Sequence, residues 1–455
     1  MERDSDTICA LATAQGLGAI SIIRISGRHA EKIIRKLAPF LPSSLESHRI
    51  YYGYLRALRD DQPLDEVLIS YFQHGRSFTG ECTFEISCHG SDSIANEILH
   101  NLVESGARPA ERGEFTYRAF MNGRIDLVQA ESVLALIESR SRRASQLALR
   151  QLQGEFSTRL KILLERVTWV LAQLEANIDF ASEDIVIAGN DEIHRRLTDV
   201  LEDTDQILSG YHRGRIIRSG YQVALAGLPN AGKSSLLNAL AGEDRAIVTP
   251  VPGTTRDFVE AELSENGVRI TLVDTAGLRE TDDAVEKIGV ARTLDKLCDV
   301  DLVFYVVSAE TGMRPDEARF FDRVPWNKTC LLINKIDMYT KVNVLDSEVK
   351  HALAVMPVSA VTGQGLPEVK EWIRERLRTE LSEDSTLLSN ARHFRSLGIL
   401  RESVANSLSL VLKEESPDLI ALELQTGLRA LYEILGLTYD DQVMDRVFAE
   451  FCLGK

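Results

Sequence analysis

The hydrophobic and polar positions of this chain change their period several times along its length. Residues 18–27 form a run rich in β-branched residues that one arginine interrupts, and residues 67–72 and 82–87 are similar runs. Apolar residues recur at helical spacing over 29–37 and 93–103. Short strands mixed with helices in this way predict a small α+β domain over residues 1–120.

The pattern becomes helical between about residues 125 and 213. Apolar residues from Leu149 to Ile178 follow one another at steps of three and four, which places them on one face of a long helix that only Gly154 interrupts. This stripe predicts helix packing rather than a cofactor site. Helical patterns return from residue 382 to the end, where Ser416 and Pro417 are typical of a helix start.

Strand-like apolar runs alternate with mostly helical stretches between these two helical regions. This alternation predicts a doubly wound, mainly parallel sheet over residues 220–379. The runs that we expect to form its strands are 222–226, 268–274, 302–307, 330–334 and 355–359.

One loop in this region has a sequence typical of phosphate binding. Gly227–Ser234 fits the pattern G-x-x-x-x-G-K-[ST] between an apolar run and a helical pattern. Gly227 and Gly232 let successive N–H groups turn toward phosphate oxygens. Lys233 places a positive charge at the β- and γ-phosphates, and the hydroxyl of Ser234 can ligate Mg²⁺. The expected nucleotide contacts of this loop are Asn230, Ala231, Gly232, Lys233, Ser234 and Ser235.

Two further segments complete the expected phosphate site. Asp274 ends a predicted strand, where it can hold Mg²⁺ through water, and the N–H of Gly277 can meet the γ-phosphate. Residues 249–257 form the expected switch loop, with Thr255 as a second Mg²⁺ ligand. The expected nucleotide contacts of these segments are Thr249, Thr254, Thr255, Asp274, Thr275, Ala276 and Gly277.

The motif Asn334-Lys335-Ile336-Asp337 selects the base. Its carboxylate at Asp337 can accept hydrogen bonds from N1–H and the 2-amino group of guanine, which adenine lacks. A backbone N–H of the Ser359-Ala360 pair can reach the guanine O6. The expected guanine contacts are Asn334, Lys335, Asp337, Ser359 and Ala360. These motifs occur in order at strand ends, and together they predict GTP binding.

We therefore predict a multidomain protein of mixed α/β and α+β class. A small α+β domain occupies residues 1–120, a discontinuous helical domain residues 121–219 and 380–455, and an inserted Ras-like P-loop GTPase domain residues 220–379. Contacts between the two helical segments are expected from this arrangement.

These motifs do not identify the residue that orients the attacking water. Leu278 follows Asp-Thr-Ala-Gly and cannot orient water, so another polar residue is required. The local candidates are Glu280, Asp282, Asp283 and Glu286. Each of them has the alternative interpretation of a solvated charge in the switch loop.

The composition limits which partners and which cellular location we expect. The net charge of −16 disfavours a broad nucleic-acid-binding surface, although a local basic groove or a basic partner stays possible. No apolar run reaches the length of a membrane span, and the acidic start lacks a signal-type apolar core, which predicts a cytoplasmic protein without a membrane contact. The six cysteines are scattered without a CxxC pair, which favours structural thiols over a zinc site.

The combination of motifs resembles the tRNA-modification GTPase family MnmE, also called TrmE. The resemblance covers essentially the whole chain and includes 18–27, Arg112-Gly113-Glu114-Phe115, the inserted GTPase domain and the terminal 451–455, Phe-Cys-Leu-Gly-Lys. Leu453 replaces the isoleucine of the family's usual ending.

This resemblance implies a homodimer and a folate site. The N-terminal domain of the family dimerises and binds 5-formyltetrahydrofolate or a related reduced folate, with Arg24, Glu85, Arg124 and Lys455 at the folate-contacting positions. Arg124 stands where the family more often has lysine. Lys455 at the folate requires the C-terminus to reach the N-terminal domain. Cys452 matches a C-terminal cysteine that is implicated in the family's function.

The resemblance also implies K⁺-dependent hydrolysis that pairing of the GTPase domains across the dimer activates. Asn230 matches the side-chain K⁺ ligand, and the loop that adds K⁺ ligands contains Thr249, Val251 and Thr254. Glu286 falls at the position of the family's water-activating glutamate, which makes it the catalytic candidate rather than Glu280.

The function implied is modification of tRNA at the wobble uridine, U34. With an FAD-dependent MnmG partner, the family installs a carboxymethylaminomethyl or aminomethyl group at C5, using a one-carbon unit from folate. The alternative is a regulatory GTPase switch resembling ribosome-assembly factors such as Era or EngA, which should carry a basic RNA-binding appendage. An ATP-dependent P-loop enzyme is disfavoured by residues 334–337.

Overall fold

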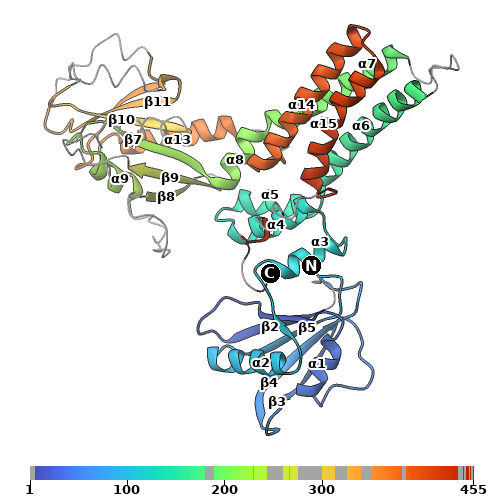
Figure 1. The fold of residues 1–455 in the computed structure, drawn as a ribbon. Helices are drawn as coiled ribbons and strands as arrows, with labels where there is room; N and C mark the ends of the chain where they lie inside the picture. Colours follow the sequence, from blue (N-terminus) through green and yellow to red (C-terminus); the bar gives the residue numbers. More distant parts are fainter. Residues whose placement is uncertain are drawn as a thin grey trace, which may run out of the picture. The chain divides into compact units, whose positions relative to one another are not determined.

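The computed structural model describes most of the chain. Its described residues are 6–179, 189–228, 230–242, 260–265, 267–274, 300–312, 325–339, 351–381 and 386–438, with residues 444, 447–449, 451 and 454. The chain divides into two compact units (Figure 1). The first unit comprises 1–137, 151–201 and 399–455, and the second comprises 138–150 and 202–398. The predicted multidomain class is confirmed, whereas the predicted domain boundaries stay a prediction.

The first unit begins with a mostly antiparallel sheet. Its strands, within the described residues, are β1 (Ile8–Leu11), β2 (Ile20–Ser26), β3 (Arg49–Arg56), β4 (Pro63–Phe72), β5 (Thr83–His89) and β6 (Arg108–Pro109), in the order β3-β4-β5-β2-β1-β6. Two helices, α1 (Ala30–Leu37) and α2 (Asp92–Glu104), pack on the sheet (Figure 1). The strands and helices predicted within residues 18–103 are confirmed, and β1, β3 and β6 are additional.

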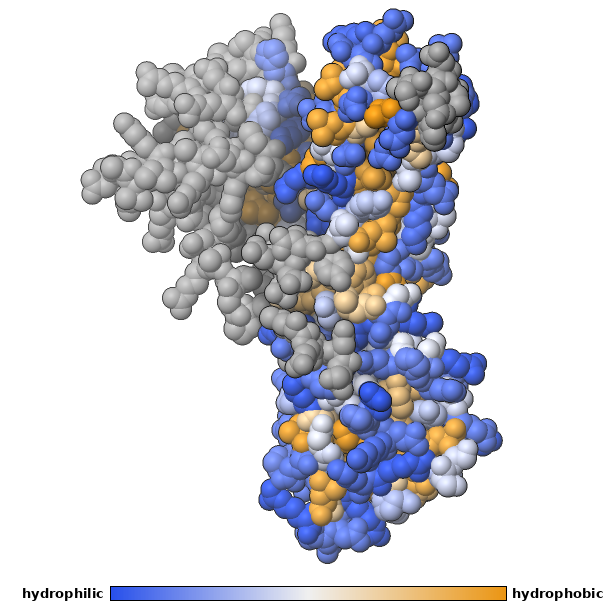
Figure 2. Space-filling model, turned by 45° about the vertical axis from the view of Figure 1, so that its right-hand side comes forward, coloured by the Kyte–Doolittle hydropathy of each residue, from blue (hydrophilic) through white to orange (hydrophobic). Residues whose placement is uncertain are grey.

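One face of this sheet points away from the buried core. It carries both charged and exposed apolar side chains. Cross-strand register aligns Arg24, Glu85, Ser70 and Ile50 in one row, and the adjacent row ends in Leu68 and Tyr52. Ile50 is 63% exposed and Tyr52 66% exposed, and hydrophobic residues are visible among hydrophilic ones on this domain in Figure 2. Side chains on a strand alternate between faces, so Arg24 and Glu85 share a face with these apolar residues.

A buried ion cluster connects the ends of the sheet to the next helix, α3 (Glu114–Met121). The guanidinium of Arg118, a residue only 4% exposed, lies 2.6 Å from Asp6, 2.9 Å from Glu114 and 3.1 Å from Glu81. Arg108 adds ion pairs with Asp6 at 2.7 Å and with Glu114 at 2.6 Å. Since every carboxylate of this ion cluster has a guanidinium partner, the charges are compensated inside the protein.

The first unit also contains long helices. Within the described residues they are α4 (Leu127–Glu138), α6 (Glu155–Asp179), α7 (Asn190–Ser209), α14 (Ala391–Leu412) and α15 (Pro417–Leu435), of which α7 and α14 extend into the second unit, whereas α5 (Arg142–Leu152) lies mostly in the second unit. The buried residues of α6 follow the predicted apolar stripe. The predicted interruption at Gly154 is confirmed. Gly154 has a φ of 87° and lies between the end of α5 and the start of α6, so the two segments form separate helices. Ser416 precedes α15 as predicted. Helix α6 packs along α15 (Figure 1), so segments on both sides of residues 220–379 contact each other.

The second unit contains the predicted parallel sheet. Its strands, within the described residues, are β7 (Tyr221–Ala226), β8 (Glu260–Glu265), β9 (Val268–Asp274), β10 (Leu302–Ser308), β11 (Thr329–Asn334) and β12 (Ala354–Pro357), in the order β12-β11-β10-β7-β9-β8. All neighbours are parallel except the pair of β8 and β9, and β8 was not predicted. Besides most of α5, the helical elements within the described part of this unit include α8 (Tyr211–Ser219), α9 (Lys233–Ala241), the 3-10 helix η4 (Trp326–Lys328) and α13 (Leu366–Glu380).

Two expectations from the sequence concern membrane spans and the cysteines. No helix within the described ranges is long and apolar enough to cross a membrane. Burial raises the pKa of the Cys9, Cys82 and Cys88 thiols to about 11, so they carry no thiolate at neutral pH.

The ion cluster predicts an acid-sensitive N-terminal domain. Burial opposes ionisation of Asp6 and Glu114, but hydrogen bonds from Arg108 and Arg118 outweigh it and lower the pKa of both carboxyls. Their stabilisation is therefore complete at neutral pH and is lost as pH falls below about 4 toward the lowered folded-state values. Glu114→Gln should cost about 3–5 kcal/mol at pH 7, because it leaves buried guanidinium charge uncompensated.

Thermal unfolding of the full chain between pH 7 and pH 3 measures this effect. Glu46→Gln is the control, since the pair of Glu46 with Arg49 is exposed and contributes little. A Glu114→Gln variant with the stability and pH profile of the control would contradict the assigned role of the ion cluster.

Candidate functional site

The phosphate-binding loop has the backbone geometry that its sequence predicts. Gly227 has a φ of 134°, and a Cβ atom there would lie 2.2 Å from the carbonyl oxygen of Val306. Gly232 has a φ of 93° and directly precedes α9, so the N-terminus of this helix faces the loop. Asn230 adopts a left-handed φ of 64°. A side chain at either glycine position would fill the space in which this loop turns.

Lys233 is positioned at the base of the loop. Its Nζ donates hydrogen bonds to the carbonyl oxygens of Gly227 at 2.7 Å and Leu228 at 2.8 Å, and the residue is 6% exposed. Ser234 follows in the first turn of α9. A buried ammonium beside a helix N-terminus creates the positive potential that a polyphosphate requires.

Asn334 links the base-reading motif to the phosphate-binding loop. Its Nδ2 donates to the carbonyl oxygen of Ala231 at 2.9 Å, and its Oδ1 accepts from the backbone N–H of Ala360 at 3.1 Å. A Cβ atom at Gly232 would lie 2.2 Å from the same Nδ2. Three predicted nucleotide-contacting segments therefore meet at one buried amide side chain.

Asp337 lies at the carboxyl edge of the sheet with its carboxylate held in place. The hydroxyl of Ser359 donates to its Oδ1 at 2.6 Å, which leaves Oδ2 available for a base. Lys335 has a left-handed φ of 68°, and its Nζ lies 3.7 Å from the carboxylate of Glu310. The predicted guanine contacts Asn334, Lys335, Asp337, Ser359 and Ala360 thus form one cluster.

Several predicted residues lie outside the described residues. They are Thr249, Val251, Thr254, Thr255, Thr275, Ala276, Gly277, Glu286, Cys452 and Lys455. Asp274 ends β9, and its backbone lies in register with Leu225 of β7. The roles of these residues stay predictions.

A second cluster lies on the exposed face of the N-terminal sheet. Arg24 pairs with Glu85 through Nη2 at 2.7 Å and Nε at 2.9 Å, and its Nη1 donates to the carbonyl oxygen of Gly454 at 3.4 Å. The Arg24 guanidinium also lies 5.8 Å from the ring centre of Phe78 and 5.4 Å from that of Phe115. The pairing of Arg24 with Glu85 follows from the register of β2 and β5, whereas nothing in the sequence around Phe78 marks it as their neighbour.

The C-terminal segment reaches this cluster. Gly454 has a φ of 85°, and a Cβ atom there would lie 2.2 Å from the carbonyl oxygen of Leu11. The residue next to Lys455 therefore lies against the N-terminal sheet, as the predicted role of Lys455 requires. Arg124 is close to the same region, since its Cγ lies 3.2 Å from the Cβ position of Gly80.

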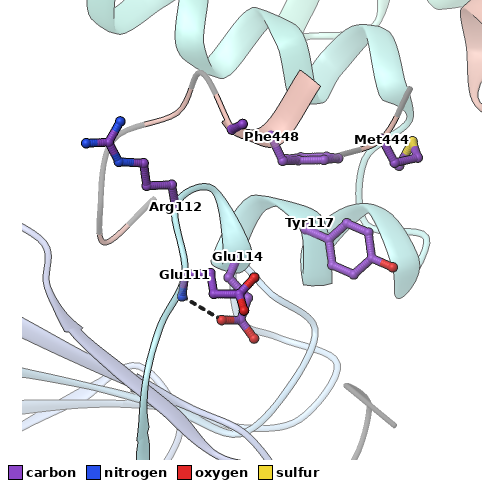
Figure 3. Close-up of a pocket in the computed structure, with 7 residues that line it drawn as sticks. Glu111, Arg112, Glu114, Tyr117, Met444 and Phe448 are labelled. Carbon is purple, nitrogen blue, oxygen red and sulfur yellow. Dashed lines mark hydrogen bonds between the residues drawn. The ribbon is translucent and has the colours of Figure 1, made fainter. Parts of the chain in front are cut away.

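A cavity of about 490 Å³ is lined by residues of the segment 111–117 and of the C-terminal segment 444–449 (Figure 3). The carboxylates of Glu111 and Glu114 lie together, Tyr117 lies on the same helix as Glu114, and Phe448 comes from the C-terminal segment (Figure 3). The Glu114 carboxylate accepts the backbone N–H of Glu111 at 2.8 Å, while the two rings meet edge to face at 5.4 Å. A Cβ atom at Gly113 would lie 2.7 Å from the carbonyl oxygen of Phe448, so this motif fits closely against the C-terminal segment.

Comparison with protein-family models agrees with this arrangement. Residues 7–124 match the model described as GTP-binding protein TrmE N-terminus, and residues 127–452 match the MnmE helical domain. The tRNA modification GTPase MnmE of Bdellovibrio bacteriovorus is 44% identical, with 100% of this chain and 98% of that protein covered. The chain belongs to the MnmE family of tRNA modification GTPases. The family's protein from Moorella thermoacetica is 40% identical, with 99% of each chain covered.

Solved structures of GTP-binding proteins are similar to part of this chain. The G domain of the T. maritima FeoB iron transporter is 34% identical and covers 34% of this chain and 97% of its own length, with a TM-score of 0.26. A variant of Era from Aquifex aeolicus, bound to GDP and AlF4⁻, is 26% identical and covers 40% of this chain and 66% of its own, with a TM-score of 0.28. At these TM-scores the likeness adds nothing to the family assignment.

The geometry around Asp337 predicts a change of base preference in Asp337→Asn. The substitution replaces an acceptor of two guanine N–H groups with an amide that can donate, and Ser359 still holds the side chain. We expect GTP affinity to fall by roughly a hundredfold or more and the preference to shift to XTP.

Equilibrium binding of GTP and XTP measures the shift. Glu310→Gln is the matched control, because it removes a negative charge from the same sheet edge without altering the base-reading carboxylate. Retained GTP preference in Asp337→Asn would remove Asp337 from base recognition.

Proposed function

We propose that this chain is a K⁺-dependent GTP hydrolase that modifies tRNA as a homodimer. Together with an FAD-dependent MnmG-type partner, it installs a carboxymethylaminomethyl or aminomethyl group at C5 of the wobble uridine. The observation that carries the proposal is family membership over the whole chain, joined to a phosphate-binding loop that Asn334 holds against the guanine-reading motif.

The GTPase residues divide into binding and chemical roles. Lys233 and the loop amides bind the β- and γ-phosphates, and Ser234 and Thr255 would hold Mg²⁺. Asp274 would support the same ion. The glycine positions that would not admit a Cβ atom fit a polyphosphate in this loop. Asn230 and the loop containing Thr249, Val251 and Thr254 would hold K⁺, which would supply positive charge to offset the negative charge that develops during hydrolysis.

The N-terminal cluster fits a reduced folate. Arg24, whose guanidinium lies near two aromatic rings, and Glu85 offer charged groups to a heterocycle. Arg124 and Lys455 complete the proposed set, and Cys452 stands two residues before Gly454. When bound, a reduced folate would supply the one-carbon unit for C5 of the uridine.

A second copy of the chain fits the exposed face of the N-terminal sheet. Ile50, Tyr52 and Leu68 are exposed on the face that carries Arg24 and Glu85. Apolar residues that gather beside a polar site are typical of a protein interface. Dimerisation there would enclose the folate and would bring two GTPase domains into one assembly.

The alternative function is a regulatory GTPase switch that acts by binding alone. Such a protein needs no folate, so titration of the full chain with 5-formyltetrahydrofolate separates the two functions. Saturable binding supports the modification enzyme, and absence of binding favours the switch.

The catalytic proposal predicts that Glu286→Ala retains GTP affinity and loses most turnover. The reason is that Glu286 orients water and contributes little to nucleotide binding, and a group of this kind contributes roughly 10²- to 10⁴-fold to the rate. Wild-type hydrolysis should be faster in K⁺ than in Na⁺ at equal ionic strength. Phosphate release is measured in both salts for the wild type, Glu286→Ala and the neighbouring control Glu280→Ala. Unchanged hydrolysis in Glu286→Ala, or equal rates in the two salts, would contradict the mechanism.

A further inference from the structure

A second cavity of the first unit, of about 390 Å³, lies beside α3, α4, α6 and the end of α15. Its polar lining includes Arg124, Asp126 and Lys161, and its apolar lining includes Phe120, Leu435 and Leu437. A cavity of this size is within the range of ligand sites, roughly 300–1,000 Å³. Nothing in the proposed GTPase mechanism uses it.

The cavity has an excess of positive charge. Within the described part of the chain, the Arg124 side chain forms no hydrogen bond or ion pair, whereas Lys161 lies 3.4 Å from the carboxylate of Asp126. That carboxylate also accepts the Gln129 N–H at 3.0 Å and the Ser157 hydroxyl at 2.9 Å. One carboxylate therefore faces two cationic side chains.

The same carboxylate fixes the start of α4. Asp126 accepts from the Gln129 N–H, and the Gln129 side chain accepts from the Asp126 N–H at 3.0 Å, which is a reciprocal capping arrangement. The N-terminus of α4 therefore lies at the cavity with its partial positive charge. This charge adds to those of Arg124 and Lys161.

The cavity adjoins the cluster around Arg24. Gly80 has a φ of 80°, and its Cβ position lies 3.2 Å from the Arg124 Cγ. Phe78, two residues earlier, lies beside the Arg24 guanidinium. The short segment 78–80 therefore lies near Arg24 at Phe78 and near the side chain of Arg124, which lines the cavity, at Gly80.

We propose that this cavity binds the γ-linked glutamate tail of a polyglutamylated folate whose other end lies at Arg24 and Glu85. This inference rests on the proposed folate function. Each γ-linked glutamate adds one carboxylate and two methylene groups. The Arg124 guanidinium can bind a carboxylate in two-point geometry, Lys161 adds a point charge, and the apolar lining contacts the methylene groups.

The affinities of 5-formyltetrahydrofolate with one and with five glutamates test the inference in the full chain. We expect the pentaglutamate to bind roughly three- to tenfold more tightly at low salt, and this gain should shrink as salt screens the charges. The readout is the ratio of the two affinities. Lys161→Ala should remove most of the gain. Arg159→Ala is the control, because it removes an exposed positive charge from α6 at a position that does not line the cavity, and it should keep the gain.

Three outcomes would overturn the inference. Monoglutamate binding without a gain for the pentaglutamate would reject the tail site and leave the folate function intact. Absence of binding by either folate would reject both proposals. A Lys161→Ala variant that keeps the gain but loses affinity for a tRNA anticodon stem-loop would assign the cavity to RNA phosphates instead.

Discussion

The buried ion cluster around Arg118 is the constraint on which the N-terminal site depends. Arg118 and Arg108 join three carboxylates that come from the chain start, the segment before β5 and helix α3. Buried charges are tolerated only where their partners are well placed, so these segments have little freedom to move apart. Helix α3 also carries Phe115, which lies beside Arg24. Gly113, the residue that precedes this helix, contacts the C-terminal segment. The geometry of the proposed folate site therefore depends on where the ion cluster holds α3.

In the GTPase region, a buried but uncharged side chain has a similar role. The amide of Asn334 joins the phosphate-binding loop at Ala231 to the loop after the last strand at Ala360. Base recognition and phosphate binding are thus coupled through one buried side chain at the sheet edge. Any displacement of this side chain would affect both ends of the nucleotide at once. In both units, then, a buried polar side chain sets the spacing between segments that are distant in the sequence.

Elements with a strong local signal could be predicted from the sequence. The glycine break at residue 154, the Ser416 start of α15 and the buried strands of the second unit all depend on local propensity or periodicity. Strand β3 was missed because it is an edge strand whose exposed face is apolar, which removes the usual alternation. The approach of Phe78 to Arg24, and of Arg124 to Gly80, depends on tertiary packing, so no local pattern could indicate it.

The central claim is that the C-terminal segment completes a folate site on the N-terminal sheet, and Gly454→Ala tests it most directly. A Cβ atom at residue 454 would meet the Leu11 carbonyl oxygen at 2.2 Å, so the substitution should displace the segment. Gly75→Ala is the matched control, with a similar φ of 77° and no atom within 4 Å of its Cβ position. We predict that Gly454→Ala weakens 5-formyltetrahydrofolate binding roughly tenfold or more, as expected when a charged contact is lost, while the control binds like the wild type. Wild-type folate affinity in Gly454→Ala would contradict the account.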